Sequence, residues 1–172
     1  MPTLVFETTV RAPIERVWSF HDDVAAALPA LSPPAARVKI ESADLPVRHG
    51  SRIVITAQGP LGLRLRWVAR IVEHTPPQAD PPGAAGASAR FVDEQESGPF
   101  KSWRHEHTFA EIDEHSTRLT DRVTYAVRFG PLGLLADRLF VRRQVEAMFR
   151  HRHEALPRLL ASGPLSGVKS SA

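Results

Sequence analysis

The segment between residues 89 and 129 constrains the fold more than any other part of this 172-residue chain. It contains three stretches rich in strand-forming residues, 89–96, 101–112 and 116–129, which are separated only by the turns "SGPF" and "DEH". Strands joined by connections this short lie side by side and run antiparallel. We therefore predict a three-stranded meander here.

The last of these stretches indicates which side of the sheet is buried. Arginines and threonines fill its even positions, and its odd positions carry Leu119, Val123, Tyr125 and Val127. Such alternation is typical of a strand with one face on the core. In the preceding strand, His105 and His107 have the same parity as Trp103 and Phe109. We predict that both histidines point inward.

Two aspartates have the parity to meet these histidines. If neighbouring strands pair odd positions with odd, Asp121 lies opposite or diagonal to His107, and Asp93 lies near His105. We therefore expect inward His–Asp contacts, with Tyr125 and Gln95 nearby.

The rest of the chain supplies four more strands and the helices. Strands are predicted at 3–10, 36–42, 50–59 and 63–74, and two short helices lie within 11–34. In the fourth of these strands Trp67 belongs to the apolar face. The Pro-, Gly- and Ala-rich stretch 75–88 is interpreted as a long surface loop.

A long helix is predicted to begin at Gly130. Pro157 is expected to kink or end it. Its predicted apolar stripe consists of Leu135, Leu139, Val145, Met148, Phe149, Leu156 and Leu159/Leu160. Its arginines are interpreted as a solvated face: Arg142, Arg143, Arg150, Arg152 and Arg158. We expect one domain over residues 1–162 and a flexible tail over 163–172. Helices segregated from an antiparallel sheet indicate the α+β class.

Composition excludes several classes of function. The chain has no cysteine, so disulfides, thiolate metal sites and cysteine nucleophiles are excluded, and a bacterial-type cytoplasm is the expected location. No apolar run approaches the ~18 residues of a membrane span, and the N-terminus lacks a signal-peptide pattern. A net charge of +3 gives little support for a nucleic-acid partner.

Four stretches resemble the START-like SRPBCC superfamily, in its polyketide cyclase/dehydrase and lipid transport group. They are "TTVRAPIERVWSFHDD", "FVDEQESGPFKSWRHEHTF", "TRLTDRVTYAV" and "FGPLGLLADRLFVRRQVEAMFRHR". The resemblance implies a helix-grip fold: a curved seven-stranded antiparallel sheet wrapped round a long C-terminal helix, two short helices after the first strand, and a cavity between sheet and helix. It implies no cofactor. The superfamily shares no catalytic set, so no catalytic residue is carried over.

Our first hypothesis is a non-enzymatic module that binds a small hydrophobic molecule in the sheet–helix cavity. A fully packed interior would count against it. The residues expected to line the site are Trp67, Phe91, Asp93, Gln95, Trp103, His105, His107, Phe109, Asp121, Tyr125 and Phe149. We expect no nucleic-acid partner and no stable membrane insertion; a homodimer is possible.

Three alternatives stay open for the histidines. They can form only a satisfied polar network with their aspartates. They can act as an acid–base pair with Asp121, in a cyclase or dehydratase. A His-x-His pair with Asp93 or Asp121 can also chelate a metal. Because the resemblance includes no metal, we expect none.

Overall fold

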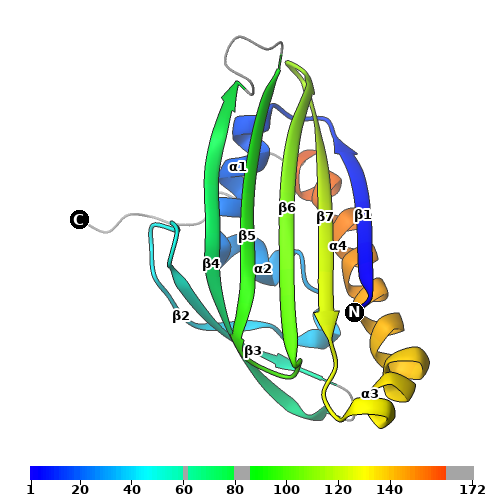
Figure 1. Ribbon diagram of the computed structural model, residues 1–172. Helices are drawn as coiled ribbons and strands as arrows, with labels where there is room; N and C mark the ends of the chain where they lie inside the picture. Colours follow the sequence, from blue (N-terminus) through cyan, green and yellow to red (C-terminus); the bar gives the residue numbers. More distant parts are fainter. Residues whose placement is uncertain (60–61, 80–85, 162–172) are drawn as a thin grey trace.

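The computed structural model describes residues 1–59, 62–79 and 86–161 (Figure 1). Its seven strands form one antiparallel sheet in the order β1-β7-β6-β5-β4-β3-β2. The strands are β1 (Thr3–Val10), β2 (Lys39–Ala43), β3 (Arg52–Gln58), β4 (Arg64–Ala79), β5 (Ala87–Ser97), β6 (Ser102–Asp113) and β7 (Ser116–Ala126).

The helices lie together on one face of this curved sheet, as Figure 1 shows. They are α1 (Ile14–Asp22), α2 (Val24–Ala30), the 3-10 turn η1 (Pro34–Ala36), α3 (Gly130–Ala136), the π-helical turn η3 (Asp137–Val141) and α4 (Arg142–Ala161). The α+β class and the helix-grip arrangement predicted from the sequence are confirmed.

The predicted loop at 75–88 was wrong for most of its described residues. β4 runs on to Ala79, and β5 begins at Ala87, so both strands are longer than expected. Composition misled here, because Pro76 and Pro77 lie where the β4–β5 register shifts. Such a bulge tolerates residues that cannot donate to the ladder. Residues 80–85 lie outside the described part of the chain.

The closing helix consists of α3, η3 and α4 in succession and extends from Gly130 to Ala161. It does not end at Pro157, which lies inside α4. Among the described residues, no helix combines the length and apolarity that a membrane crossing requires. The tail predicted at 163–172 lies outside the described residues.

Three apolar clusters lie in the described part of the chain, and two of them flank the two histidines. One joins α1 to the C-terminal part of α4 and contains Trp18, Phe109, Leu119, Leu156 and Leu160. The other lies under the start of α4 and contains Leu4, Trp103, Val123, Tyr125, Val145 and Phe149. On β6, Phe109 belongs to the first cluster and Trp103 to the second. The two histidines between them are therefore enclosed by apolar layers on both sides.

Candidate functional site

Strand register brings the predicted histidines and aspartates together. His107 pairs with Asp121 across the β6–β7 ladder, and Asp93 pairs with His105 across the β5–β6 ladder. Both histidines are buried, at 4% and 5% exposure, and Asp121 is completely buried. The odd-with-odd pairing inferred from the alternation of β7 is confirmed.

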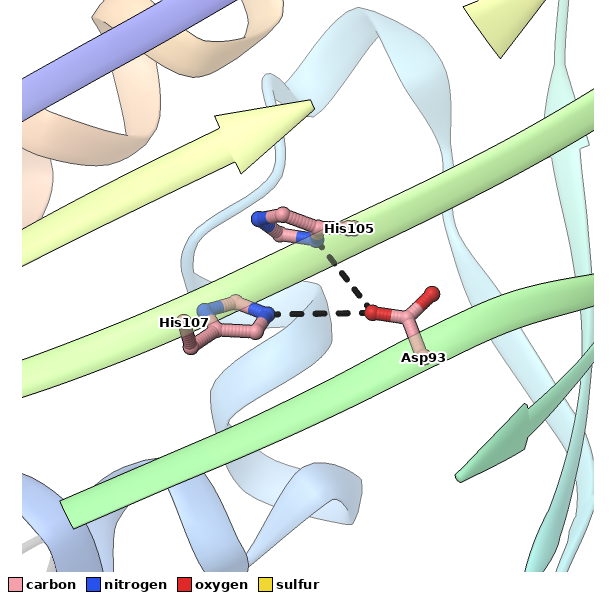
Figure 2. A group of neighbouring side chains, drawn as sticks. All are labelled: Asp93, His105 and His107. Carbon is pink, nitrogen blue, oxygen red and sulfur yellow. Dashed lines mark ion pairs between the residues drawn. The ribbon is translucent and has the colours of Figure 1, made fainter. Parts of the chain in front are cut away.

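The four side chains form a closed ring of ion-pair contacts. Asp93 Oδ2 lies 3.3 Å from Nδ1 of His105 and 3.8 Å from Nε2 of His107 (Figure 2). On the other side, Asp121 Oδ1 lies 3.1 Å from Nε2 of His105 and 2.7 Å from Nδ1 of His107. The two contacts to Asp121 Oδ1 are at ion-pair distance but lack hydrogen-bond alignment. Every imidazole nitrogen of His105 and His107 therefore faces a carboxylate oxygen. We call Asp93, His105, His107 and Asp121 the His–Asp ring.

The closing helix contributes a third histidine that the sequence analysis did not single out. Nε2 of His153 lies 2.8 Å from Oδ2 of Asp121 and is hydrogen-bonded to it. His153 follows Phe149 by four residues, so both lie on the buried stripe of α4. That spacing was the signal in the sequence. The contact links the helix directly to the aspartate of β7.

Two further polar side chains are buried beside this ring. Arg152, which the sequence analysis placed on a solvated face, is only 8% exposed, and its guanidinium carbon lies 5.0 Å from the centre of the Phe149 ring. That prediction was wrong for Arg152 alone, since the other four predicted arginines of the helix are exposed. The charge of a side chain does not indicate which arginine of a helix faces the sheet. His21 of α1 is also buried; its Nδ1 lies 2.8 Å from the Val17 carbonyl oxygen, and its Nε2 has no hydrogen-bond partner.

Burial and charge act in opposite directions on the titration of the ring. Burial alone would lower the pKa of His105, but the carboxylates of Asp121 and Asp93 outweigh it and raise that pKa above its usual value. Burial alone would raise the pKa of each aspartate, but His105 and His107 lower the pKa of both, that of Asp121 well below its ordinary range. The charged forms of His105, Asp93 and Asp121 therefore stabilise one another.

His21 and Arg152 respond mainly to burial. Burial, followed by the charge of His107, lowers the pKa of His21 to about 3, so its ring is neutral at pH 7. Burial also lowers the pKa of Arg152 below that of a free guanidinium, although Asp121 and Asp93 oppose the shift.

The predicted aromatic residues divide between the two apolar clusters. Phe91 stacks on His107 with 3.9 Å between ring centres, and Phe109 lies in the α1 cluster. Trp67, Phe100 and Trp103 lie together on the other side, with centres 4.9–5.6 Å apart. The Phe149 ring covers His105 edge-on at 4.8 Å. We call Trp67, Phe100, Trp103, Tyr125 and Phe149 the aromatic layer.

Two of the predicted polar residues lie apart from the His–Asp ring. Gln95 exchanges two hydrogen bonds with the backbone of Phe100 and so closes the β5–β6 turn. The Tyr125 hydroxyl donates to Asp137 Oδ1 of η3 at 2.8 Å, and burial together with that carboxylate raises the pKa of Tyr125. Both residues hold local structure, and neither contacts the histidines by hydrogen bond.

The pockets found in the described part of the chain lie at the surface. One, of about 440 Å³, is lined by Asp44, Leu45, Arg48, His49, Gly50 and Ser51. Another, of about 310 Å³, is lined by residues from Met1, the β5–β6 hairpin and Thr124. Neither opens onto the His–Asp ring. Phe91 and Phe149 instead pack directly against the two histidines, with 3.9 Å between the ring centres of Phe91 and His107 and 4.8 Å between those of Phe149 and His105.

The start of the closing helix exposes apolar side chains instead of burying them. Five of them are exposed by about half or more of their surface: Phe129 (83%), Leu132 (76%), Leu135 (55%), Leu139 (49%) and Phe140 (63%). Figure 1 shows α3 beyond the end of β7, away from the middle of the sheet. Contiguous exposed apolar side chains of this kind usually mark a contact surface or a ligand entrance.

Comparison with known proteins identifies the family to which the chain belongs. The family described as "Polyketide cyclase / dehydrase and lipid transport" matches residues 10–154, and the chain belongs to that family. This agrees with the START-like SRPBCC resemblance of the sequence. No curated protein matched the chain.

Solved structures with the same fold differ widely in sequence. Protein Ms6760 from Mycobacterium smegmatis is 24% identical with a TM-score of 0.62, over 93% of this chain and 91% of that one. A START superfamily protein from the same organism is 14% identical with a TM-score of 0.65, over 93% and 97%. Norcoclaurine synthase from Thalictrum flavum, solved with dopamine and hydroxybenzaldehyde, is 12% identical with a TM-score of 0.62, over 95% and 88%. At these identities the likeness shows the fold alone.

Proposed function

We propose that the protein binds a small hydrophobic molecule between the sheet and the start of the closing helix, without transforming it. The ligand would lie against the aromatic layer, and its polar end would face the His–Asp ring. In this proposal the site lies at the end of the sheet–helix space where the closing helix begins.

The observation that carries the proposal is the continuity of the aromatic layer with the exposed start of the helix. Trp67 and Phe100 are only partly buried, and η3 above Tyr125 leads into the exposed apolar side chains of α3. Because Phe149 covers His105 and neither of the two surface pockets includes a residue of the His–Asp ring, a ligand would enter by lifting α3 and η3. The apolar surface it then covers would supply affinity, at about 25 cal/mol per Å².

The cyclase or dehydratase alternative receives less support from the geometry. A general acid or base must have one ring nitrogen free to meet the substrate. In the His–Asp ring, both nitrogens of His105 and of His107 face carboxylate oxygens. The norcoclaurine synthase of similar fold was solved with two small aromatic compounds, dopamine and hydroxybenzaldehyde. An aromatic compound is therefore one candidate ligand for this chain.

Two measurements test the proposal. Native mass spectrometry and organic extraction of the purified chain should reveal a co-purifying hydrophobic compound. The fluorescent probe 1-anilinonaphthalene-8-sulfonate should bind the extracted protein saturably, and the compound should displace it. Absence of any compound together with non-saturable probe binding would overturn the proposal.

A pair of tryptophan variants localises the binding. Trp67→Leu should weaken probe binding by at least about tenfold, because it removes one side of the aromatic layer. Trp18→Leu is the matched control: it also removes a tryptophan, but from the α1 cluster. Equal weakening by both variants, with both still folded by circular dichroism, would place the ligand elsewhere.

A further inference from the structure

We propose that Asp93, His105 and His107 form a binding site for one divalent transition-metal ion, although the family resemblance led us to expect none. Among the described residues, these three offer ligand atoms that lie within 4.8 Å of one another. Figure 2 shows one oxygen of Asp93 facing a nitrogen of each histidine. The site borders the aromatic layer, because the Phe149 ring covers His105, but it does not depend on the proposed ligand.

The separations of these atoms suit a small ion. Nδ1 of His105 lies 3.3 Å from Oδ2 of Asp93, and Nε2 of His107 lies 3.8 Å from the same oxygen. Zinc–ligand bonds of ~2.0–2.2 Å in a tetrahedron place neighbouring ligand atoms about 3.3–3.6 Å apart. Small side-chain rotations would therefore complete three of the four positions. Two imidazoles and one carboxylate are a donor set that zinc and iron both accept.

Asp121 is placed as the outer partner of both histidines. Each histidine turns its remaining nitrogen toward Asp121 Oδ1, at 3.1 and 2.7 Å. Metal-binding histidines almost always hydrogen-bond their second nitrogen to a carboxylate, a carbonyl or water, which fixes the ring and its tautomer. The rotations that bring the three ligands together would also have to align these two contacts. Asp121 is held in turn by His153 of α4.

Charge and access also favour an ion. Asp93 and Asp121 bring two negative charges into a region lined by buried rings, where a bound divalent cation would take over the charge compensation that protonated His105 otherwise supplies. The side chain of Asp93 is 17% exposed, whereas that of Asp121 is 0% exposed. An ion could therefore reach the three ligands from the Asp93 side, while Asp121 stays behind them.

Metal titration of the full chain, purified without a histidine tag and stripped with chelator, tests the site. We expect one equivalent of Zn²⁺ to bind and raise the melting temperature. Co²⁺ should give the intense visible absorption of a tetrahedral nitrogen–oxygen site. A cobalt spectrum like that of the hydrated ion, or less than one equivalent of zinc bound, would overturn the proposal. These two readouts need no variant.

Three substitutions separate the ligands from their surroundings. Asp93→Asn should weaken zinc binding more than about 100-fold, and Asp121→Asn by about 10–100-fold, the usual cost of losing an outer partner. His115→Ala is the control, because His115 is exposed and its ion-pair partner is Glu114; its zinc affinity should be unchanged. Zinc binding to folded Asp93→Asn as tight as to the wild type would overturn the site.

Discussion

The two ends of the closing helix present opposite surfaces to the rest of the molecule. In the C-terminal half, Phe149, Leu156 and Leu160 are buried, and His153 is hydrogen-bonded to Asp121 of β7. At the start, Leu132, Leu135 and Phe140 are mostly exposed. The same helix is thus fixed to the sheet at one end and presents an uncovered apolar face at the other. In the proposed function, the start is therefore the part expected to move when a ligand enters.

Local features at the start of the helix fit this division. Phe129 and Gly130 both have positive φ values, 69° and 52°, so the chain turns sharply as it leaves β7. This conformation is unfavourable for a bulky residue such as Phe129. A Cβ atom at Gly133 would collide with the carbonyl oxygen of Arg128. The hydrogen bond from Tyr125 to Asp137 then ties η3 to the sheet. This hydrogen bond would have to break for α3 and η3 to lift.

The largest expected effect is at the fixed end. Phe149→Ala should lower the free energy of unfolding by about 3–5 kcal/mol, because the ring is fully buried and packs on Phe6 with 5.1 Å between ring centres. Phe140→Ala is the matched control and should change it by less than about 0.5 kcal/mol. Urea unfolding measures both, and similar losses would contradict the contrast between the two ends.

Tyr125→Phe should remove the hydrogen bond that joins Asp137 of η3 to β7. Loss of a buried hydrogen bond to a carboxylate should cost about 1.5–3 kcal/mol, since Asp137 keeps its burial but loses its partner. Hydrogen exchange should accelerate in residues 130–141 more than in 149–160. Uniform acceleration over the whole helix would show that the hydroxyl does not separate the two parts.

His21 should make the fixed end sensitive to acid. Its pKa is lowered to about 3 in the folded chain from an ordinary 6.5, so the unfolded chain binds the extra proton. Stability from this residue is therefore lost as pH falls below 6.5, by about 2 kcal/mol at pH 5. Relative to the wild type, His21→Leu should gain roughly that amount between pH 7 and pH 5. Parallel pH profiles of the two proteins would contradict the assignment.

The smallest effect on stability is expected at the exposed end. Leu135→Ser should change the free energy of unfolding by less than about 0.5 kcal/mol, because the side chain is 55% exposed. It should nonetheless weaken binding of the hydrophobic probe, if α3 covers the ligand. Light scattering on the same variant tests the possible homodimer. Conversion of a wild-type dimer to a monomer would assign the face to a second copy of the chain instead.

The alternation along the strands was enough to predict the floor of the site. Parity on β7 predicted the pairing of His107 with Asp121, and that of Asp93 with His105 followed from the short turn. The alternation could not show which side chains of the closing helix reach the His–Asp ring. His153 lies on a predictable stripe, but nothing in the sequence aligns that stripe with Asp121. Arg152 was misassigned for the same reason. Contacts between strand and helix depend on helix rotation, which local patterns do not specify.

Hydrogen exchange along the closing helix of the wild-type chain tests the central claim most directly. Amides in residues 132–141 should exchange at least about tenfold faster than those in 149–160, because few buried contacts hold them. Addition of the co-purifying hydrophobic compound should slow exchange in the first range and leave the second unchanged. Equal protection of both ranges, unaffected by the compound, would contradict the account.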